Sequence, residues 1–268
     1  LDYSLLGLAT AKLLSSVTHR LLNNYFLNRV QEFKDKLDVP TGESKNTLKI
    51  LLTGSYKLGF NMLGSFMINR GNLFLIGAFL PLSVVSAYGL TMQIFNLTVY
   101  ISQTHFNTIF PLLAKYRMLK MFNLLKREFL KSFLISILLY ASGVIFIALF
   151  VGDFLQIIGS KSKMLNLNYI WFLSLIVLLE LVHSTFATFI VSSNKVPFLW
   201  PSIVSGIGVL VFGYILNKTT SLGLWSFLIA QFCVQLAYNN WKWPLVVIME
   251  LNMRFRDVGL AVRSLRIK

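Results

Sequence analysis

Long apolar runs alternate with short polar segments along the whole chain. A helix needs about 20 apolar residues to cross the hydrocarbon core of a bilayer, whereas membrane β-strands alternate apolar and polar residues over about 10 positions. The candidate runs cover residues 1–17, 50–79, 84–110, 131–151, 167–192, 198–216 and 222–241. The pattern therefore predicts an all-α integral membrane protein with about seven transmembrane helices. Because the six prolines lie in loops or near the ends of these runs, we expect the helices to be continuous.

Basic residues are concentrated in every second break between these runs. The segments 18–49 and 113–131, Lys195 and the tail 242–268 hold 19 Lys and Arg residues, whereas the intervening breaks hold only Lys161, Lys163 and Lys218. Basic residues in short loops stay on the cytoplasmic side of a membrane. We therefore expect the first run to start outside and the C-terminus to lie in the cytoplasm.

The longest polar break predicts a division into two lobes. We assign residues 1–28 to the last helix of an N-terminal lobe with its cytoplasmic extension, and 29–47 to an inter-lobe loop that contains Pro40 and Gly42. Residues 48–241 form a six-helix C-terminal lobe, and 242–268 form a basic interfacial tail that contacts anionic lipids. The chain begins at Leu1 inside an apolar run, so we expect an N-terminal part of five further spans to precede it.

Composition agrees with a membrane environment and excludes other classes. Hydrophobic residues make up 56% of the 268 residues and charged residues only 13%, which is too apolar for an ordinary soluble domain. The net charge of +15 does not indicate nucleic-acid binding, because the basic residues punctuate apolar runs and form no continuous basic face. The single cysteine, Cys233, excludes a disulfide framework or a cysteine-based metal site within this chain.

Five polar residues in the run 84–110 follow steps of 3, 4, 3 and 4 and therefore share one helical face. They are Gln93, Asn96, Tyr100, Gln103 and Asn107. Polar residues inside a membrane helix usually face the bundle interior or a water-filled cavity. We interpret this stripe as a cavity wall that hydrogen-bonds sugar hydroxyls, while interhelical hydrogen bonding remains the alternative.

Arg70 lies about ten residues, or roughly 15 Å, from the outer end of its run, near the middle of the bilayer. A guanidinium at that depth suits bidentate binding of phosphate oxygens, with Asn69 and Asn72 as further donors. Lys57 lies nearer the cytoplasmic side and has a weaker claim to a phosphate. The alternative is that Arg70 belongs to a buried ion pair that fixes helix packing.

Glu180 and His183 lie in the middle of the run 167–192, with Ser184 beside them. Membrane carboxylates of this kind carry protons in pumps and transporters, so this pair is a candidate for coupling transport to a proton gradient. A salt bridge between Arg70 and Glu180, or a hydrogen-bonded core histidine, is the alternative. The second Glu-x-x-His pair that a di-metal site requires is absent, so we expect no metal or other cofactor.

Two segments resemble bacterial polysaccharide exporters and O-antigen flippases of the multidrug-exporter-like superfamily. In residues 68–117 a helix with scattered polar residues comes first. A second, amide-rich helix then begins with the motif Ser-x-Tyr-Gly-Leu and ends at Pro111, before a basic loop. The end of the last run, AYNNWKWPLVVIMEL at 237–251, resembles the end of the twelfth helix of that family. The resemblance implies the last helix of an N-lobe plus the six-helix C-lobe of a two-lobe exporter.

The resemblance further implies a non-enzymatic function in the bacterial inner membrane. Such an exporter carries undecaprenyl-pyrophosphate-linked sugar repeat units outward by alternating access, and glycan polymerase and assembly proteins are its expected partners. A multidrug or small-solute exporter of the same fold and a membrane enzyme of glycan assembly are the alternatives. A seven-helix receptor is suggested by the span count alone.

Overall fold

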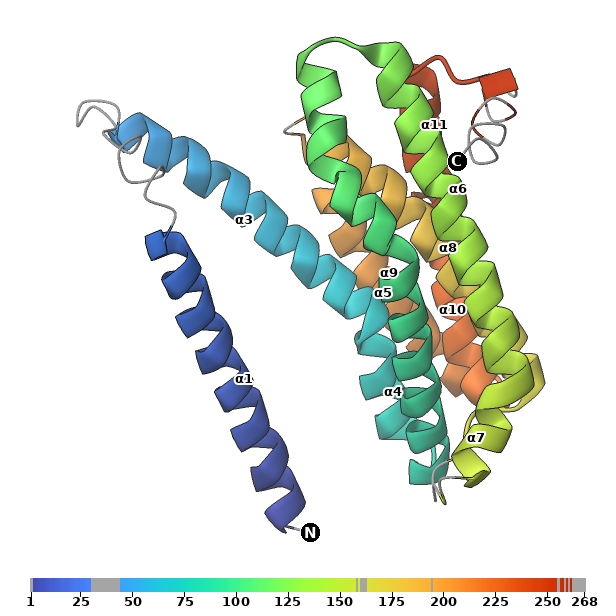
Figure 1. Ribbon diagram of the computed structural model, residues 1–268. Coiled ribbons are helices and arrows are strands. Elements are labelled where there is room, and N and C mark those ends of the chain that lie inside the picture. Colours follow the sequence, from blue (N-terminus) through green and yellow to red (C-terminus); the bar gives the residue numbers. More distant parts are fainter. Residues whose placement is uncertain are drawn as a thin grey trace. The chain divides into compact units, whose positions relative to one another are not determined.

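The computed structural model describes residues 2–29, 44–157, 159, 163–193, 195–254, 256–257, 259 and 261 (Figure 1). The chain forms two compact units, residues 1–55 and 56–268. Helix α1 (Asp2–Arg29) lies in the first unit, and α3 (Ser44–Asn69) runs from the first unit into the second. The predicted loop 29–47 lies largely outside the described residues.

The second unit is a helical bundle, with no strand among its described residues. After α3 the elements are α4 (Gly71–Phe79), α5 (Leu82–Met118), α6 (Phe122–Phe146), the π-helical turn η1 (Ile147–Val151), α7 (Gly152–Ile157), α8 (Leu167–Val191), α9 (Leu199–Thr219), α10 (Leu224–Ala237) and α11 (Asn239–Glu250). Successive long helices run in alternating directions (Figure 1).

Four helical segments among the described residues are long and apolar enough to cross a membrane. They are α5, the continuous segment from α6 through α7 (Phe122–Ile157), α8 and α9. Large apolar side chains stay exposed along them, including Leu97, Leu138, Leu149 and Val204. An exposed apolar surface of this extent is typical of contact with lipid or with other helices. The all-helical, multi-span character expected from the sequence is therefore confirmed at this level.

Two of the predicted continuous helices are interrupted, so that expectation was wrong. The run 50–79 divides into α3 and α4 at Arg70, and the run 222–241 divides into α10 and α11 at Tyr238. Weak helix formers lie at both breaks: Asn69 and Gly71 flank Arg70, and Asn239 and Asn240 follow Tyr238. By contrast, α5 continues through Pro111 to Met118, beyond the end that we predicted.

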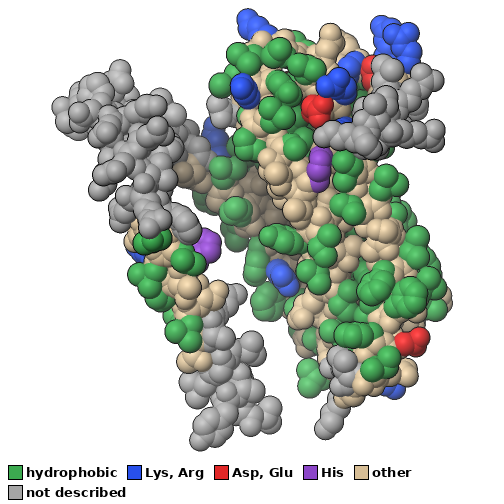
Figure 2. All heavy atoms as spheres, in the orientation of Figure 1, with side chains coloured by type: hydrophobic (Ala, Val, Ile, Leu, Met, Phe, Trp, Pro, Cys, Tyr) green, Lys and Arg blue, Asp and Glu red, His purple; other side chains and the backbone are tan. Residues whose placement is uncertain are grey.

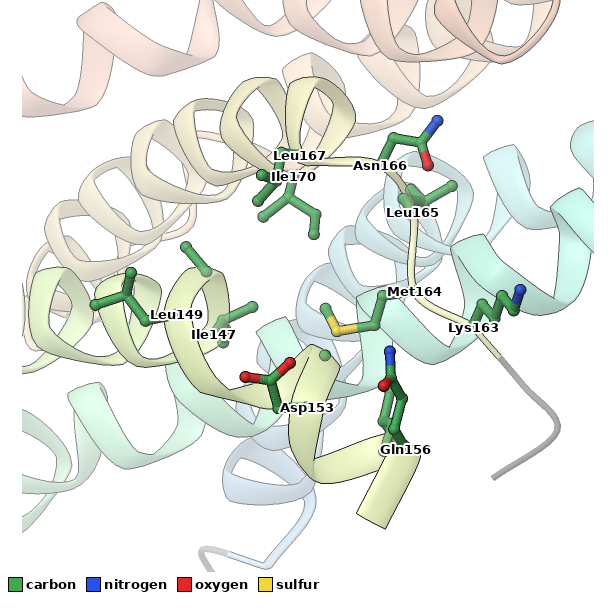
Figure 3. A pocket seen from close by; sticks show the side chains of 13 residues that line it. Ile147, Leu149, Asp153, Gln156, Lys163, Met164, Leu165, Asn166, Leu167 and Ile170 are labelled. Carbon is green, nitrogen blue, oxygen red and sulfur yellow. The ribbon is translucent and has the colours of Figure 1, made fainter. Parts of the chain in front are cut away.

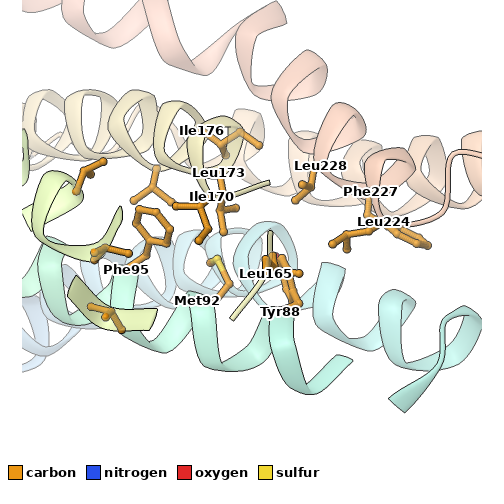
Figure 4. Close-up of a cluster of buried hydrophobic side chains, with 14 of the residues drawn as sticks. Tyr88, Met92, Phe95, Leu165, Ile170, Leu173, Ile176, Leu224, Phe227 and Leu228 are labelled. Carbon is orange, nitrogen blue, oxygen red and sulfur yellow. The ribbon is translucent and has the colours of Figure 1, made fainter. Parts of the chain in front are cut away.

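Aromatic and aliphatic side chains form two buried clusters along the bundle. The first joins α5, α8 and α10 through Tyr88, Phe95, Leu173 and Phe227 (Figure 4). In the second cluster the ring of Phe129 on α6 lies 4.4 Å from that of Phe189 on α8, centroid to centroid. These contacts fix α5, α6, α8 and α10 relative to one another, which gives the site described below a rigid frame.

Small residues bring α3 and α9 into close contact. A methyl group added at Gly64 would lie 2.6 Å from the backbone carbon of Ser202 and 2.8 Å from the backbone nitrogen of Ile203. On the other side of this contact, a methyl group at Gly206 would lie 2.8 Å from Met67 Cβ. Small residues at such crossings let helix backbones approach closely in membranes. The Ser202 hydroxyl also donates a 2.7 Å hydrogen bond to Asn61 Oδ1 across the same contact.

Gly64→Ala is expected to destabilise the bundle, because backbone atoms of α9 cannot move aside as a flexible side chain can. Overpacking of this kind costs about 1–3 kcal/mol. The thermal midpoint in detergent micelles should fall accordingly. Gly77→Ala is the matched control, since nothing lies within 4 Å of its added methyl group. Equal midpoints for the two variants would contradict the close α3–α9 contact.

Basic side chains gather at one end of the second unit, the upper end in Figure 2. This end carries the α5–α6 turn, the α8–α9 turn and the end of α11, which the sequence placed on one side of the membrane. An Arg117–Glu250 salt bridge of 2.7 Å joins α5 to α11, and a Lys126–Asp257 salt bridge of 2.8 Å joins α6 to the C-terminal segment. The hydrogen bond from Lys126 holds the pKa of the half-buried Asp257 carboxyl below its usual value. The alternation of basic and non-basic turns thus corresponds to two opposite ends of the bundle.

Candidate solute-binding cavity

Arg70 occupies the break between α3 and α4. Its backbone N–H still donates to the carbonyl of Phe66, at 2.7 Å, and α4 begins at the next residue. Gly71 lies directly against α9, where a side chain would meet Leu210. This contact packs the start of α4 onto α9, while the Arg70 side chain stays exposed.

A cavity of about 420 Å³ lies beside this break. Three helices and the break itself contribute the lining, which consists of Met62, Ser65, Phe66, Asn69, Arg70, Met92, Asn96, Val99, Gln103, Val177, Glu180, Leu181 and Ser184. Its volume is within the range of about 300–1,000 Å³ that small-molecule sites occupy. Apolar side chains alternate with polar ones in the lining, so the cavity offers both contact area and hydrogen-bonding groups.

Glu180 is hydrogen-bonded to the end of α3. Asn69 Nδ2 donates to Glu180 Oε1 at 2.7 Å, which connects α3 to α8 across 111 residues of sequence. Among the described residues no salt bridge joins Arg70 to Glu180, which was one of the alternatives raised by the sequence. Among the described residues of the lining, Arg70 carries the single cationic group and Glu180 the single carboxyl. A cationic and an acidic side chain therefore line the same cavity without forming a salt bridge with each other.

A second polar pair closes another part of the wall. Gln103 Nε2 donates to Ser184 Oγ at 3.0 Å, and Ser184 Oγ in turn donates to the carbonyl of Leu181 at 3.1 Å. The amide nitrogen of Gln103 is thereby oriented toward α8, which leaves its carbonyl oxygen as an acceptor. Acceptors of this kind pair with hydroxyl or ammonium donors of a solute.

The cavity unites five of the residues that the sequence predicted as site residues. Asn69, Arg70, Asn96, Gln103 and Glu180 all contribute to its lining. Three different predictions, namely the phosphate site, the amide stripe and the coupling carboxyl, thus meet in one place.

Five other predicted residues are not part of the lining, and they lie on α3, α5 and α8. They are Lys57, Gln93, Tyr100, Asn107 and His183. Gln93, Tyr100 and Asn107 are exposed, whereas Lys57 and His183 are half-buried. The position of Asn72 also differs from the prediction. It is completely buried and donates to Gln231 Oε1 at 2.8 Å, so in this structure it connects α4 to α10 and does not reach the cavity.

Sequence reasoning missed Ser65, which lies one helical turn before Asn69 and lines the same cavity. The i, i+4 spacing of Ser65 and Asn69 was a usable signal, but a single serine in an apolar run is too common to select.

In the described part of the chain, no group of three or more His, Cys, Asp or Glu side chains is arranged to hold a metal ion.

Comparisons with protein-family models, with curated proteins and with solved structures find no match to this chain.

Proposed function

We propose that this chain belongs to a transporter that moves a lipid-linked oligosaccharide across the bacterial inner membrane by alternating access. One observation carries the proposal: three amides, a carboxyl and a guanidinium that makes no salt bridge among the described residues line one cavity beside the membrane-length helices α5 and α8. Polar and ionisable groups are costly in a membrane and are retained where they contact a solute, an ion or water. The resemblance of residues 68–117 to polysaccharide exporters supports the same reading.

The charges in the cavity favour an amphipathic anionic cargo. Arg70 suits the pyrophosphate, because a guanidinium binds phosphate oxygens through two parallel hydrogen bonds. Asn69 is a further donor beside Arg70, Asn96 and Gln103 suit sugar hydroxyls, and Glu180 is the group that we assign to proton coupling. His183 lies one turn from Glu180 but does not line the cavity, so we assign it an indirect role in proton coupling. Lys57, Gln93, Tyr100 and Asn107 would contact cargo elsewhere along its path.

The orientation follows from the distribution of basic residues in the second unit. Ten described Lys and Arg residues lie at the α11 end, whereas Lys163 and Lys218 lie at the other end. Under the positive-inside rule the α11 end and the C-terminus are cytoplasmic. Anionic lipids would contact this basic end, and glycan polymerase or assembly proteins are the expected partners.

A multidrug or small-cation exporter is the second candidate, and the Glu180 carboxyl in the cavity is the observation that favours it. A single carboxyl that already accepts a hydrogen bond from Asn69 is a weak cation site beside an exposed guanidinium. A glycan-assembly enzyme is less well supported, because the polar groups of the cavity do not include a clustered acid, base or metal motif.

The proposal is tested by reconstitution in lipid vesicles. A fluorescent undecaprenyl-pyrophosphate oligosaccharide is placed in both leaflets, and a membrane-impermeant quencher reports the fraction that reaches the outer leaflet over time. We expect faster transfer than in protein-free vesicles. Transfer of a lipophilic cation in place of the oligosaccharide would support the multidrug alternative, and chemical change of the glycan would support an enzyme.

A further inference from the structure

A second cavity, of about 570 Å³ (Figure 3), lies at the α7 end of the bundle, opposite the basic end (Figure 1). Its walls are the π-helical turn η1, α7, the extended segment 163–166 and the start of α8. The backbone N–H of Leu165 donates to Thr91 Oγ1 at 3.1 Å, which holds this segment against α5. π-Helical turns are rare in proteins, and those that occur are often found at functional sites. Nothing in the transport mechanism proposed above uses this cavity.

Four polar side chains contribute to the lining of this cavity. In Figure 3 the Gln156 side chain points from α7 toward Met164, the Asp153 carboxyl lies on the Ile147 side of α7, and Lys163 and Asn166 extend from the segment 163–166. In the part of the chain that the structure describes, none of these four side chains makes a hydrogen bond or salt bridge. Together they offer one carboxylate, one ammonium group and two amides, with no net charge.

The remaining lining is aliphatic and continues onto exposed apolar surface. Ile147, Leu149, Leu155, Leu167 and Ile170 belong to this part of the lining. The side chains of Phe150 and Phe154, on the same helical segment, are 56% and 57% exposed. Charged side chains beside apolar ones at the end of a membrane-length helix are expected at the level of the lipid headgroups.

The composition of the lining selects among ligands that carry polar groups. A sugar ring or a choline group is usually bound against an aromatic face, and none of the described residues that line this cavity is aromatic. A primary ammonium group needs hydrogen-bond acceptors, which Asp153 and the amide oxygens of Gln156 and Asn166 supply. A phosphate needs a cationic donor, which Lys163 supplies.

We propose that this cavity binds the phosphoethanolamine headgroup of a membrane phospholipid, with the acyl chains along the exposed apolar side of η1 and α7. Asp153 accepts from the ammonium group and Lys163 donates to the phosphate. The proposal requires that the apolar helices lie in a bilayer, but it is independent of transport and of the cargo. Failure of the flippase assay would leave it standing, and its own failure would leave the flippase assay unaffected.

Native mass spectrometry of the purified protein tests this site with phosphatidylethanolamine, phosphatidylcholine and phosphatidylglycerol of identical acyl chains. We expect preferential retention of phosphatidylethanolamine over phosphatidylcholine. Asp153→Asn and Lys163→Gln should each weaken that retention about tenfold, the effect of losing one charge-assisted hydrogen bond. Lys218→Gln is the matched control, because Lys218 lies at the same end but over the Phe79 ring, with Nζ 5.1 Å from its centroid, outside the cavity.

Three outcomes would overturn the proposal. The first is equal retention of phosphatidylethanolamine and phosphatidylcholine by the unmodified protein. The second is an undiminished preference in Asp153→Asn, whose exposed side chain can be replaced without disturbing the buried clusters. The third is displacement of the lipid by soluble phosphoethanolamine at a similar concentration, which would show that the free headgroup and not the phospholipid is the ligand.

Discussion

Cells that depend on this protein for glycan display should lose that display when Arg70 is replaced by alanine, while the amount of protein in the membrane stays unchanged. Within the described part of the chain, Arg70 is the single cation in the lining of the cavity, and its side chain is exposed and makes no salt bridge. Losing a charge-assisted contact with phosphate should weaken binding by about 3 kcal/mol, or roughly a hundredfold. Surface-glycan staining, measured beside membrane abundance, gives the result.

The control for this experiment is Lys218→Ala, which removes a cation from the second unit without touching the cavity. It should leave glycan display intact. Normal glycan display by a stably inserted Arg70→Ala protein would reject the role of Arg70 as the pyrophosphate anchor. Loss of both display and membrane abundance would instead assign Arg70 to folding.

Glu180→Gln is expected to make transport insensitive to an imposed pH gradient. Glutamine keeps a carbonyl oxygen that can still accept the hydrogen bond from Asn69 Nδ2, so the contact between α3 and α8 is preserved while the titratable group is removed. In vesicles, the unmodified protein should transport faster when a proton gradient is applied, and the variant should not respond. Asp153→Asn, a carboxyl change outside this cavity, should respond as the unmodified protein does. A full response by Glu180→Gln would reject the coupling role.

The sequence predicted individual helices well wherever an apolar run had clear polar ends. The prediction 167–192 agrees closely with α8 (Leu167–Val191), because a continuous apolar run lies between Asn166 and Ser192. The prediction of a continuous helix over 50–79 failed at Arg70, because hydropathy is averaged over about 19 residues and cannot detect a break of one residue. That break also explains why Asn72 does not line the cavity with Asn69. Residues 69 and 72 would share a face on a continuous helix, but the interruption lets Asn72 contact α10 while Asn69 contacts α8.

The amide stripe on α5 illustrates what periodicity can and cannot predict about a site. The steps of 3 and 4 place Gln93 and Asn107 on the same face of α5 as Asn96 and Gln103, yet only the latter two line the cavity. From Gln93 to Asn107 the stripe extends about 21 Å at 1.5 Å per residue, which is longer than the cavity wall it contributes to. Which part of a face meets other polar groups is decided by tertiary packing, here by the positions of α3 and α8.

The central claim is that the cavity beside Arg70 is filled with water and accepts the cargo, and cysteine labelling tests it most directly. In a background where Cys233 is replaced by serine, Asn96→Cys places a thiol in the cavity lining, and Leu97→Cys places one on the adjacent exposed apolar position, which is 60% exposed. A charged, water-soluble thiol reagent should label Asn96→Cys and spare Leu97→Cys, and the lipid-linked oligosaccharide should protect the first. Absence of labelling at Asn96→Cys, or labelling that the cargo does not reduce, would contradict the account.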